Sequence, residues 1–427
     1  MTPPSLTNQP TGPDPGPATG PDPDPDASSG CVVRKRCVFY VSGFDPKGAS
    51  RYHALYRDEA GKQSRVSGVP MEVGPREKTP QGNAFWQVAA QANGGAVATH
   101  FEFLRWDDIV RSHWPKNQVR LLWSVMATTW LNVRTGAAWR MLKLAWPPVV
   151  AMFSAFLLLC AMLLGTPLLA VLVFMAVLPA GGPWAAVAAS GMACALWVQC
   201  GRMLEKKYSM LWLMRSYAFT AQQAQGQVPQ MDARLEQHAA TVRQRIEAGL
   251  DDEVLVVGHS SGAMLAASVL AKVLRRAPQA GAGRAVVSLL TLGHCMPMLG
   301  CLPQAQAFRD DLQVLATAPG FDWIDFTAPP DGCCFALVDP LAACGVQASG
   351  LRRPKLLSPR FAEMFDAPAY RSLCQDKFRI HFQYLMASGK PVPYDYFAIT
   401  AGAETLATRF RAFPGVTGYS RFQVFGR

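Results

Sequence analysis

The chain has 427 residues, enough for one large domain with extensions or for two domains. Its formal net charge is +11, half of its residues are hydrophobic and only 17% are charged. A charge fraction this low argues against a freely soluble enzyme and favours contact with a membrane.

The cysteines do not form a disulfide framework. They number eleven, and two of them, Cys333 and Cys334, are adjacent. We therefore expect a reducing compartment. His294, Cys295 and Cys301 could suggest a metal site, but no C-x-x-C pair accompanies them, so none is predicted.

Residues 1–30 are predicted to be a disordered tail. Proline, glycine, aspartate, serine and threonine dominate this stretch, and it has almost nothing to bury. It has neither the basic start nor the apolar centre of a secretory signal peptide.

Residues 31–143 are predicted to form the first part of an α/β domain. The expected elements are a buried strand at 37–41, a helix at about 49–59, a short strand at 66–73, a helix at about 83–91 and a strand at 98–104. Strands that alternate with helices are typical of a mostly parallel sheet flanked by helices.

Residues 144–202 are predicted to form a transmembrane hairpin. The stretch 117–143 is an amphipathic helix in which tryptophan alternates with arginine, and no charged residue follows between Lys143 and Arg202. About 20 apolar residues span a bilayer, so this run is long enough for two spans. The turn at 179–183 separates segments at about 148–178 and 184–201.

Both ends of this hairpin are expected on the cytoplasmic side of a cell or inner membrane. Basic residues flank both ends: Arg134, Arg140 and Lys143 before it, and Arg202, Lys206, Lys207 and Arg215 after it. In addition, strands 37–41 and 253–258 should share one sheet. A sheet cannot be assembled from strands on opposite sides of a bilayer, so the chain between them must cross the bilayer an even number of times. The bilayer is thus the expected partner. Nucleic acid is not expected, because no binding motif accompanies the charge.

Residues 203–427 are predicted to form the second part of the domain. Two helices, at about 205–225 and 231–248, lead into an apolar strand that ends at Gly258. The sequence Gly258-His-Ser260-Ser-Gly262 and a small-residue helix follow. A serine at such a corner points its hydroxyl away from both elements, and the glycines let neighbouring backbone pass. The alternative is a plain turn between a core strand and a core helix.

This strand, turn and helix resemble the nucleophile elbow of the α/β-hydrolase family, which includes lipases and esterases. The resemblance implies that Ser260 is the nucleophile and that the backbone amides of Ser261 and Phe44 hold the oxyanion. The sequence departs from the family's usual His-Gly at the first oxyanion loop, where it has Ser42-Gly43. A plain turn after a core strand is the alternative there.

The resemblance also implies the chain order serine, acid, histidine. Beyond the elbow and its neighbour His259, the only histidines are His294 and His381. His294 directly follows a strand at 285–293, before any acid-bearing strand, so the implied base is His381, in a loop that opens into the last helices. The implied acid is Asp331, in the turn after a strand at 321–327; the alternatives are Asp339 and then Asp325.

The predicted function is a membrane-anchored serine hydrolase that cleaves a lipophilic carboxylic ester through an acyl-enzyme on Ser260. No cofactor is implied, and the sequence does not indicate an oligomeric state. A catalytically silent hydrolase fold that serves as a membrane interaction module is one alternative. An acyltransferase or thioesterase with the same triad is another.

Overall fold

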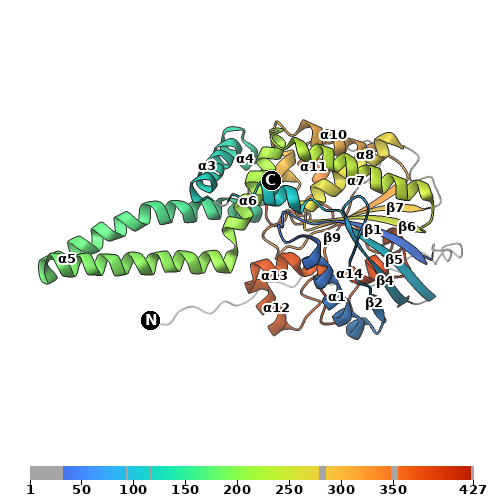
Figure 1. Cartoon of the computed structure of the whole chain (residues 1–427), viewed down its shortest axis with the longest axis horizontal. Coiled ribbons are helices and arrows are strands. Elements are labelled where there is room, and N and C mark those ends of the chain that lie inside the picture. Colours follow the sequence, from blue (N-terminus) through green and yellow to red (C-terminus); the bar gives the residue numbers. More distant parts are fainter. Residues whose placement is uncertain (1–31, 93–94, 116, 278–284, 348–353, 425–427) are drawn as a thin grey trace, which may run out of the picture.

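The computed structural model describes residues 32–92, 95–115, 117–277, 285–347 and 354–424. The tail predicted at residues 1–30 lies outside the described residues. The molecule has an α/β body from which one long helical element projects (Figure 1).

A mixed, mostly parallel sheet is the centre of the body, as the sequence predicts. Its nine described strands are β1 (Lys35–Val41), β2 (Met71–Val73), β3 (Glu77–Lys78), β4 (Ala84–Ala92), β5 (Gly95–Phe103), β6 (Glu253–His259), β7 (Val286–Leu292), β8 (Phe321–Phe326) and β9 (Lys355–Leu357). They lie in the order β2-β4-β5-β1-β6-β7-β8-β9, with β3 paired to β4. Strands β5, β1 and β6 to β9 run parallel, and β2, β3 and β4 form the antiparallel edge.

Helices flank this sheet or, in the case of α5, project from the body (Figure 1). They are α1 (Gly48–Ser67), α2 (Asp107–Ser112), α3 (Gln118–Arg134), α4 (Ala137–Leu144), α5 (Trp146–Tyr208), α6 (Met210–Ala224), α7 (Pro229–Ala248), α8 (Gly262–Arg276), α9 (Pro297–Gly300), α10 (Gln306–Thr317), α11 (Pro340–Ala343), α12 (Ala367–Gln375), α13 (Lys377–Phe382), α14 (Tyr396–Ala401) and α15 (Leu406–Arg409).

Both faces of the sheet are buried, which explains why its central strands are apolar throughout. In β1, Cys37 and Phe39 belong to the core that α7, α8 and α10 complete. Val38 and Tyr40 point to the opposite core, which α1 and α14 cover. The two-residue period of a strand thus divides its side chains between two helical layers.

The helix predicted at 83–91 is wrong, because these residues form β4. The strand predicted at 66–73 begins only at Met71, since α1 continues to Ser67. Burial alternates along β4, with Ala84 and Trp86 buried and Gln87 exposed between Trp86 and Val88. Pairing with β5 decides the conformation against the helical preference of alanine.

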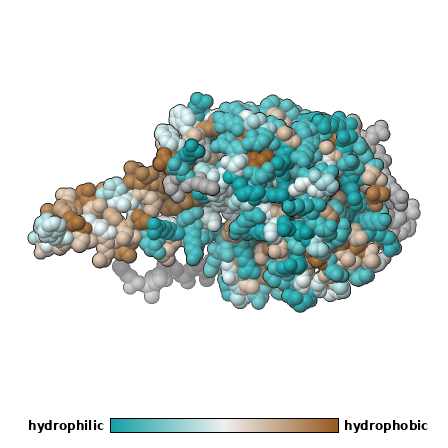
Figure 2. All heavy atoms as spheres, in the orientation of Figure 1, coloured by the Kyte–Doolittle hydropathy of each residue, from teal (hydrophilic) through white to brown (hydrophobic). Residues whose placement is uncertain are grey.

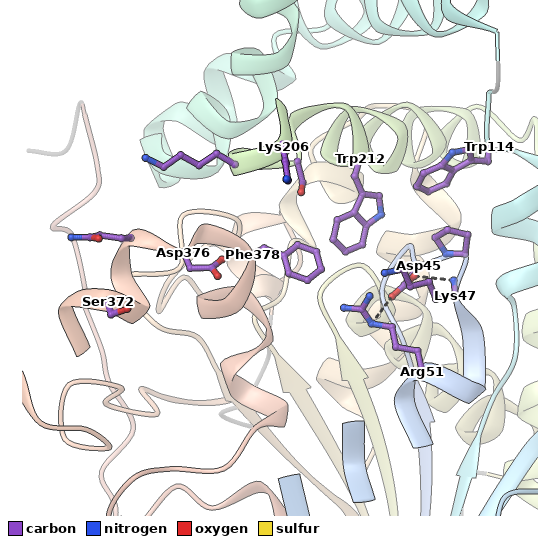
Figure 3. A pocket seen from close by; sticks show the side chains of 13 residues that line it. Asp45, Lys47, Arg51, Trp114, Lys206, Trp212, Ser372, Asp376 and Phe378 are labelled. Atoms are coloured by element: carbon purple, nitrogen blue, oxygen red, sulfur yellow. Dashed lines mark hydrogen bonds and ion pairs between the residues drawn. The ribbon is translucent and has the colours of Figure 1, made fainter. Parts of the chain in front are cut away.

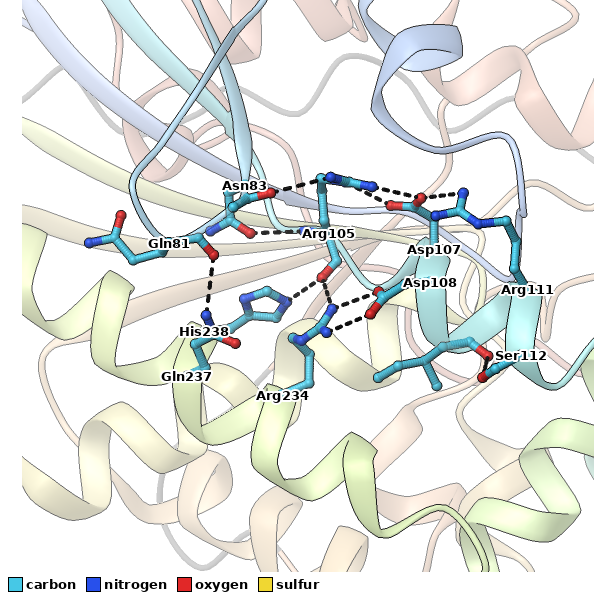
Figure 4. Close-up of polar contacts among 12 residues, drawn as sticks. Gln81, Asn83, Arg105, Asp107, Asp108, Arg111, Ser112, Arg234, Gln237 and His238 are labelled. Atoms are coloured by element: carbon cyan, nitrogen blue, oxygen red, sulfur yellow. Dashed lines mark hydrogen bonds and ion pairs between the residues drawn. The ribbon is translucent and has the colours of Figure 1, made fainter.

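A polar cluster holds α7 against the end of β5 and α2 (Figure 4). The carbonyl of Arg105 accepts hydrogen bonds from Arg234 Nη1 at 2.6 Å and from His238 Nε2 at 3.2 Å. Burial lowers the pKa of His238 to about 3, so its ring is neutral and Nε2 carries the donated proton. Arg234 also pairs with Asp108 at 2.7 Å. These bonds fix the helix that leads into β6.

The long apolar element is α5, and it doubles back on itself (Figure 1). Its backbone leaves the helical conformation at Gly182, where φ is 74° and ψ is 175°. Beyond that point the two halves touch: Ser190 Oγ donates to the Ala170 carbonyl at 3.0 Å, and Cys194 Sγ donates to the Thr166 carbonyl at 3.6 Å.

Among the helices in the described part of the chain, α5 alone is long and apolar enough to cross a membrane, and none of its most apolar stretch is buried. Figure 2 shows apolar side chains along the surface of this projection, whereas the surface of the body is mostly polar. A helix that exposes Leu164, Met175 and Leu196 in this way is unlike the core helix of a soluble protein.

Candidate active site

Ser260 occupies a strained corner between β6 and α8. Its φ is 59°, and it is one of four non-glycine residues in the described chain with positive φ. The amide of Ser260 donates to the Leu292 carbonyl at 2.8 Å, which ties the corner to the end of β7. A non-glycine residue in this left-handed backbone conformation costs energy. It persists where the surrounding structure imposes it, most often at functional sites.

The two glycines of the pentapeptide are sterically required. A Cβ on Gly258 would lie 2.6 Å from Ala263 Cα, and a Cβ on Gly262 would lie 2.2 Å from the Val41 carbonyl oxygen. In both cases the obstacle is backbone, which cannot move aside. The first turn of α8 therefore packs directly against the end of β1.

The corner lies at the topological switch point of the sheet, where successive strands are added on opposite sides of β1. From β1 the chain adds β5 on one side, and it later adds β6 on the other. The carboxyl ends of such neighbouring strands diverge and leave a crevice, which is where open α/β sheets bind ligands. Ser260 after β6 and Phe44 after β1 both lie at this crevice.

Asp331 and His381 form a buried hydrogen-bonded pair. His381 Nδ1 and Asp331 Oδ2 are 2.9 Å apart. The same carboxylate accepts from the Tyr384 hydroxyl at 3.1 Å and from the Cys333 amide at 3.0 Å. Burial acts to raise the pKa of Asp331, but the electrostatic interaction with His381 and these hydrogen-bond donors outweigh it and hold the pKa below its usual value.

Asp331 lies in the turn after β8, where the sequence places it, whereas His381 lies in the short helix α13 instead of the predicted loop. The backbone carbonyl of His381 accepts a hydrogen bond from His259 Nε2 at 2.8 Å. Burial lowers the pKa of His259 to about 3, so this ring is neutral and donates. His259 therefore links the elbow to the helix that carries His381.

The two alternative acids are engaged elsewhere. Asp339 caps α11 by accepting from the Leu341 amide at 2.8 Å. Asp325 is buried beside His294, with 3.7 Å between Oδ2 and Nε2, and accepts from Thr291 Oγ1. The structure therefore brings Asp331, and neither alternative, to His381.

The elbow contacts His381 through His259, the residue before Ser260. The rings of His259 and His381 lie 4.9 Å apart, which puts the elbow beside the histidine. Among the described residues, however, Ser260 Oγ makes no hydrogen bond. Catalytic hydrogen bonds are often long in ligand-free enzymes and tighten when substrate binds.

The two residues expected to hold the oxyanion contact each other. The Phe44 amide donates to the side-chain oxygen of Ser261 at 2.8 Å. The hydroxyl of Ser261 thus occupies the position that an anionic oxygen would take on this amide. The amide of Phe44 becomes a free donor only when the Ser261 side chain adopts another rotamer.

Trp212, which no motif in the sequence singles out, connects α5 to the site. It lies at the start of α6, directly after α5, and its Nε1 donates to the Phe44 carbonyl at 2.6 Å. Its ring lies 4.9 Å from that of Phe378 on α13. The only sequence signal was a tryptophan close to the end of the apolar run, ten residues beyond Arg202, a region in which membrane-interface residues are common.

An apolar cleft of about 400 Å³ separates the base of α5 from the histidine helix. His381 and Cys333 lie on one wall, and Trp146, Val150 and Leu213 are among the residues on the other. The cleft is large enough for part of an acyl chain, and it connects the apolar projection to the histidine.

Asp331, Cys333 and His381 also place possible metal ligands within 4.8 Å of one another. Burial, followed by the charge on Asp331, raises the pKa of the Cys333 thiol, so it stays protonated, and thiolate is the form that binds metals. His381 Nδ1 already bonds directly to the carboxylate. The geometry fits a hydrogen-bonded pair better than a metal centre.

The chain was compared with models of protein families, with curated proteins and with solved structures. None of the three comparisons finds a match.

Proposed function

We propose that this protein is a membrane-anchored serine hydrolase of the α/β-hydrolase type, which cleaves a lipophilic carboxylic ester. The observation that carries the proposal is the left-handed conformation of Ser260 at a strand-to-helix corner whose preceding residue, His259, contacts the histidine of the buried Asp331–His381 pair. A strained serine, a histidine and a histidine-bound carboxylate are the parts that nucleophilic acyl transfer requires.

In the proposed mechanism, Ser260 Oγ attacks the ester carbonyl while His381 Nε2 accepts its proton. Asp331 holds Nδ1 protonated, which leaves Nε2 free to act as the base. The amides of Ser261 and Phe44 stabilise the oxyanion once the Ser261 hydroxyl has turned away. His381 then protonates the leaving alcohol, and water cleaves the acyl-enzyme by the reverse proton path.

The same proposal makes α5 a pair of membrane spans joined near Gly182. The first half exceeds the roughly 20 apolar residues that a bilayer core requires, and the uncharged part of the second half, 183–201, is close to that length. The polar side chains Thr166 and Ser190 bond to carbonyls within α5, as the absence of water in a bilayer demands.

Both ends of α5 belong on one side of the membrane. β1, which precedes α5 in the chain, pairs directly with β6, which follows it. Two neighbouring strands of one sheet cannot lie on opposite sides of a bilayer, so the number of crossings is even. The basic residues at both ends of α5 favour the cytoplasmic side.

A catalytically silent membrane interaction module is the second candidate. It is favoured by the bond between the Phe44 amide and Ser261, and by the lack of a Ser260–His381 hydrogen bond among the described residues. In this alternative the corner at Ser260 is purely structural.

Labelling by a fluorophosphonate probe separates the two candidates. The full chain in detergent micelles should be labelled, Ser260→Ala should not, and Ser261→Ala should be, since it keeps the backbone amide and removes only the neighbouring hydroxyl. Absence of labelling in a wild-type protein that unfolds cooperatively favours the silent module. Product analysis with a labelled ester then distinguishes hydrolysis from acyl transfer.

A further inference from the structure

A second pocket, of about 810 Å³, adjoins the apolar cleft (Figure 3). Ser209, Trp212 and Phe378 line both spaces, so the two pockets are neighbours that share these residues. The second pocket lies between the C-terminal end of α5, the loop after β1 and the helices α12 and α13.

Cations outnumber anions in this second pocket. Its charged lining residues are Lys47, Arg51, Lys206 and Lys207 against Asp45 and Asp376. Both anions already have partners on the protein. Asp45 pairs with Arg51 at 3.6 Å, and Asp376 accepts from the Arg379 amide at 2.9 Å as the cap of α13.

The three lysines carry the excess positive charge. Within the described part of the chain, Lys47, Lys206 and Lys207 form no ion pair, and all three are exposed. Lys206 and Lys207 occupy the last turn of α5. If α5 spans the bilayer, these two ammonium groups lie at the depth of the lipid headgroups.

The two spaces therefore match the two ends of one amphiphile. An acyl chain fits the apolar cleft whose wall includes His381, and an anionic group fits the lysines of the adjoining pocket. Lysine ammonium groups bind phosphate as point charges and need no fixed bidentate geometry, which suits a mobile headgroup.

We propose that the substrate is a fatty-acyl ester with a phosphate-bearing headgroup, and that Lys206 and Lys207 with Lys47 bind this phosphate while the cleft holds the acyl chain. This inference rests on the proposed hydrolase function and narrows its substrate class. A neutral lipid ester has the same acyl chain but no group for the lysines, so it is the poorer substrate.

The test uses the full chain in nanodiscs of a zwitterionic diether lipid, which contains no carboxylic ester. Phosphatidic acid and diacylglycerol with identical acyl chains are supplied at low, equal mole fraction, and fatty acid release is measured. The wild type should prefer phosphatidic acid by about tenfold in kcat/KM, since about two partly screened ion pairs are at stake. Lys206→Gln/Lys207→Gln should reduce this ratio to near one.

A matched control removes the same charge outside the pocket. Arg134→Gln/Arg202→Gln neutralises two exposed cations near the ends of α5 that do not line it. This variant should keep the tenfold preference. Equal loss of the preference in both double variants would show that general attraction to an anionic surface is responsible, and would overturn the proposal.

Two further arms distinguish the substrate's own phosphate from other sources. Diacylglycerol is presented with a diether phosphatidic acid, or with dissolved inorganic phosphate. Neither addition should raise cleavage of diacylglycerol; stimulation by either one would contradict binding of the substrate headgroup. Equal cleavage of the two lipids, or cleavage of neither by a protein that the probe labels, overturns the substrate assignment alone. Absence of labelling overturns the hydrolase proposal as well.

Discussion

Replacement of Asp331 by asparagine is the most informative single change to the site. The three groups that contact this carboxylate, His381 Nδ1, the Tyr384 hydroxyl and the Cys333 amide, all donate to it. An asparagine has one oxygen and one NH₂ group. Whichever way the amide is turned, its NH₂ group therefore faces at least one donor.

The imidazole can relieve this conflict only by changing its tautomer. If the asparagine NH₂ faces His381, Nδ1 must accept and Nε2 must carry the proton, so the ring can no longer act as a base toward Ser260. The equivalent change in a serine protease lowers kcat by about 10⁴-fold, and we expect a similar loss here. Tyr384→Phe removes one hydrogen bond to the same carboxylate and should cost only about tenfold.

The assay is the rate constant for fluorophosphonate labelling, measured for the wild type and both variants, with thermal unfolding in the same detergent as the check on folding. The expected order of rates is wild type, Tyr384→Phe and then, far below, Asp331→Asn. If folded Asp331→Asn is labelled within tenfold of the wild-type rate, Asp331 does not orient the base and the assignment of the triad is wrong.

Two further predictions concern stability. Gly262→Ala should lower the free energy of unfolding by about 3 kcal/mol and abolish labelling, because its Cβ would meet the Val41 carbonyl. Gly61→Ala in α1, whose Cβ meets nothing within 4 Å, should leave stability and labelling unchanged or slightly improved. Thermal unfolding of the two variants measures the difference, and equal midpoints would contradict the packing described. Acidification from pH 7 to pH 5 should destabilise the fold by about 2 kcal/mol through His259, because burial lowers its folded pKa from about 6.5 to about 3, so that only the unfolded chain gains a proton over this range. His238 acts in the same direction, whereas the stability that Asp331 contributes through its lowered pKa is lost only below about pH 4. If the denaturation midpoint is as high at pH 5 as at pH 7, the buried, neutral state of both histidine rings is contradicted.

The strands and the elbow could be predicted from the sequence because their signals lie within short segments. The β-branched run before Gly258 and the small residues after Gly262 define a strand, a turn and a helix without reference to the rest of the chain. The order of the later strands likewise places Asp331 after β8. β4 could not be predicted, because its alanines favour a helix and only pairing with β5 makes it a strand.

The details of the site depend on contacts across the fold. The bond between the Phe44 amide and Ser261 depends on one side-chain rotamer, and no pattern in the sequence specifies it. The position of Trp212 against Phe44 depends on how α6 returns from α5 to the body. The lysine pocket combines elements more than 150 residues apart, so its excess of positive charge is visible only after folding.

The central claim is a covalent acyl-enzyme on the serine at the elbow. Peptide mapping by mass spectrometry, after rapid quenching of a reaction with an activated long-chain ester, tests this claim most directly. We predict one acyl group on the peptide that contains Ser260, absent in Ser260→Ala and formed far more slowly in His381→Ala, because His381 also activates Ser260 for the first step. An acyl group on Cys333 or on another residue, or release of fatty acid without any adduct, would contradict the account.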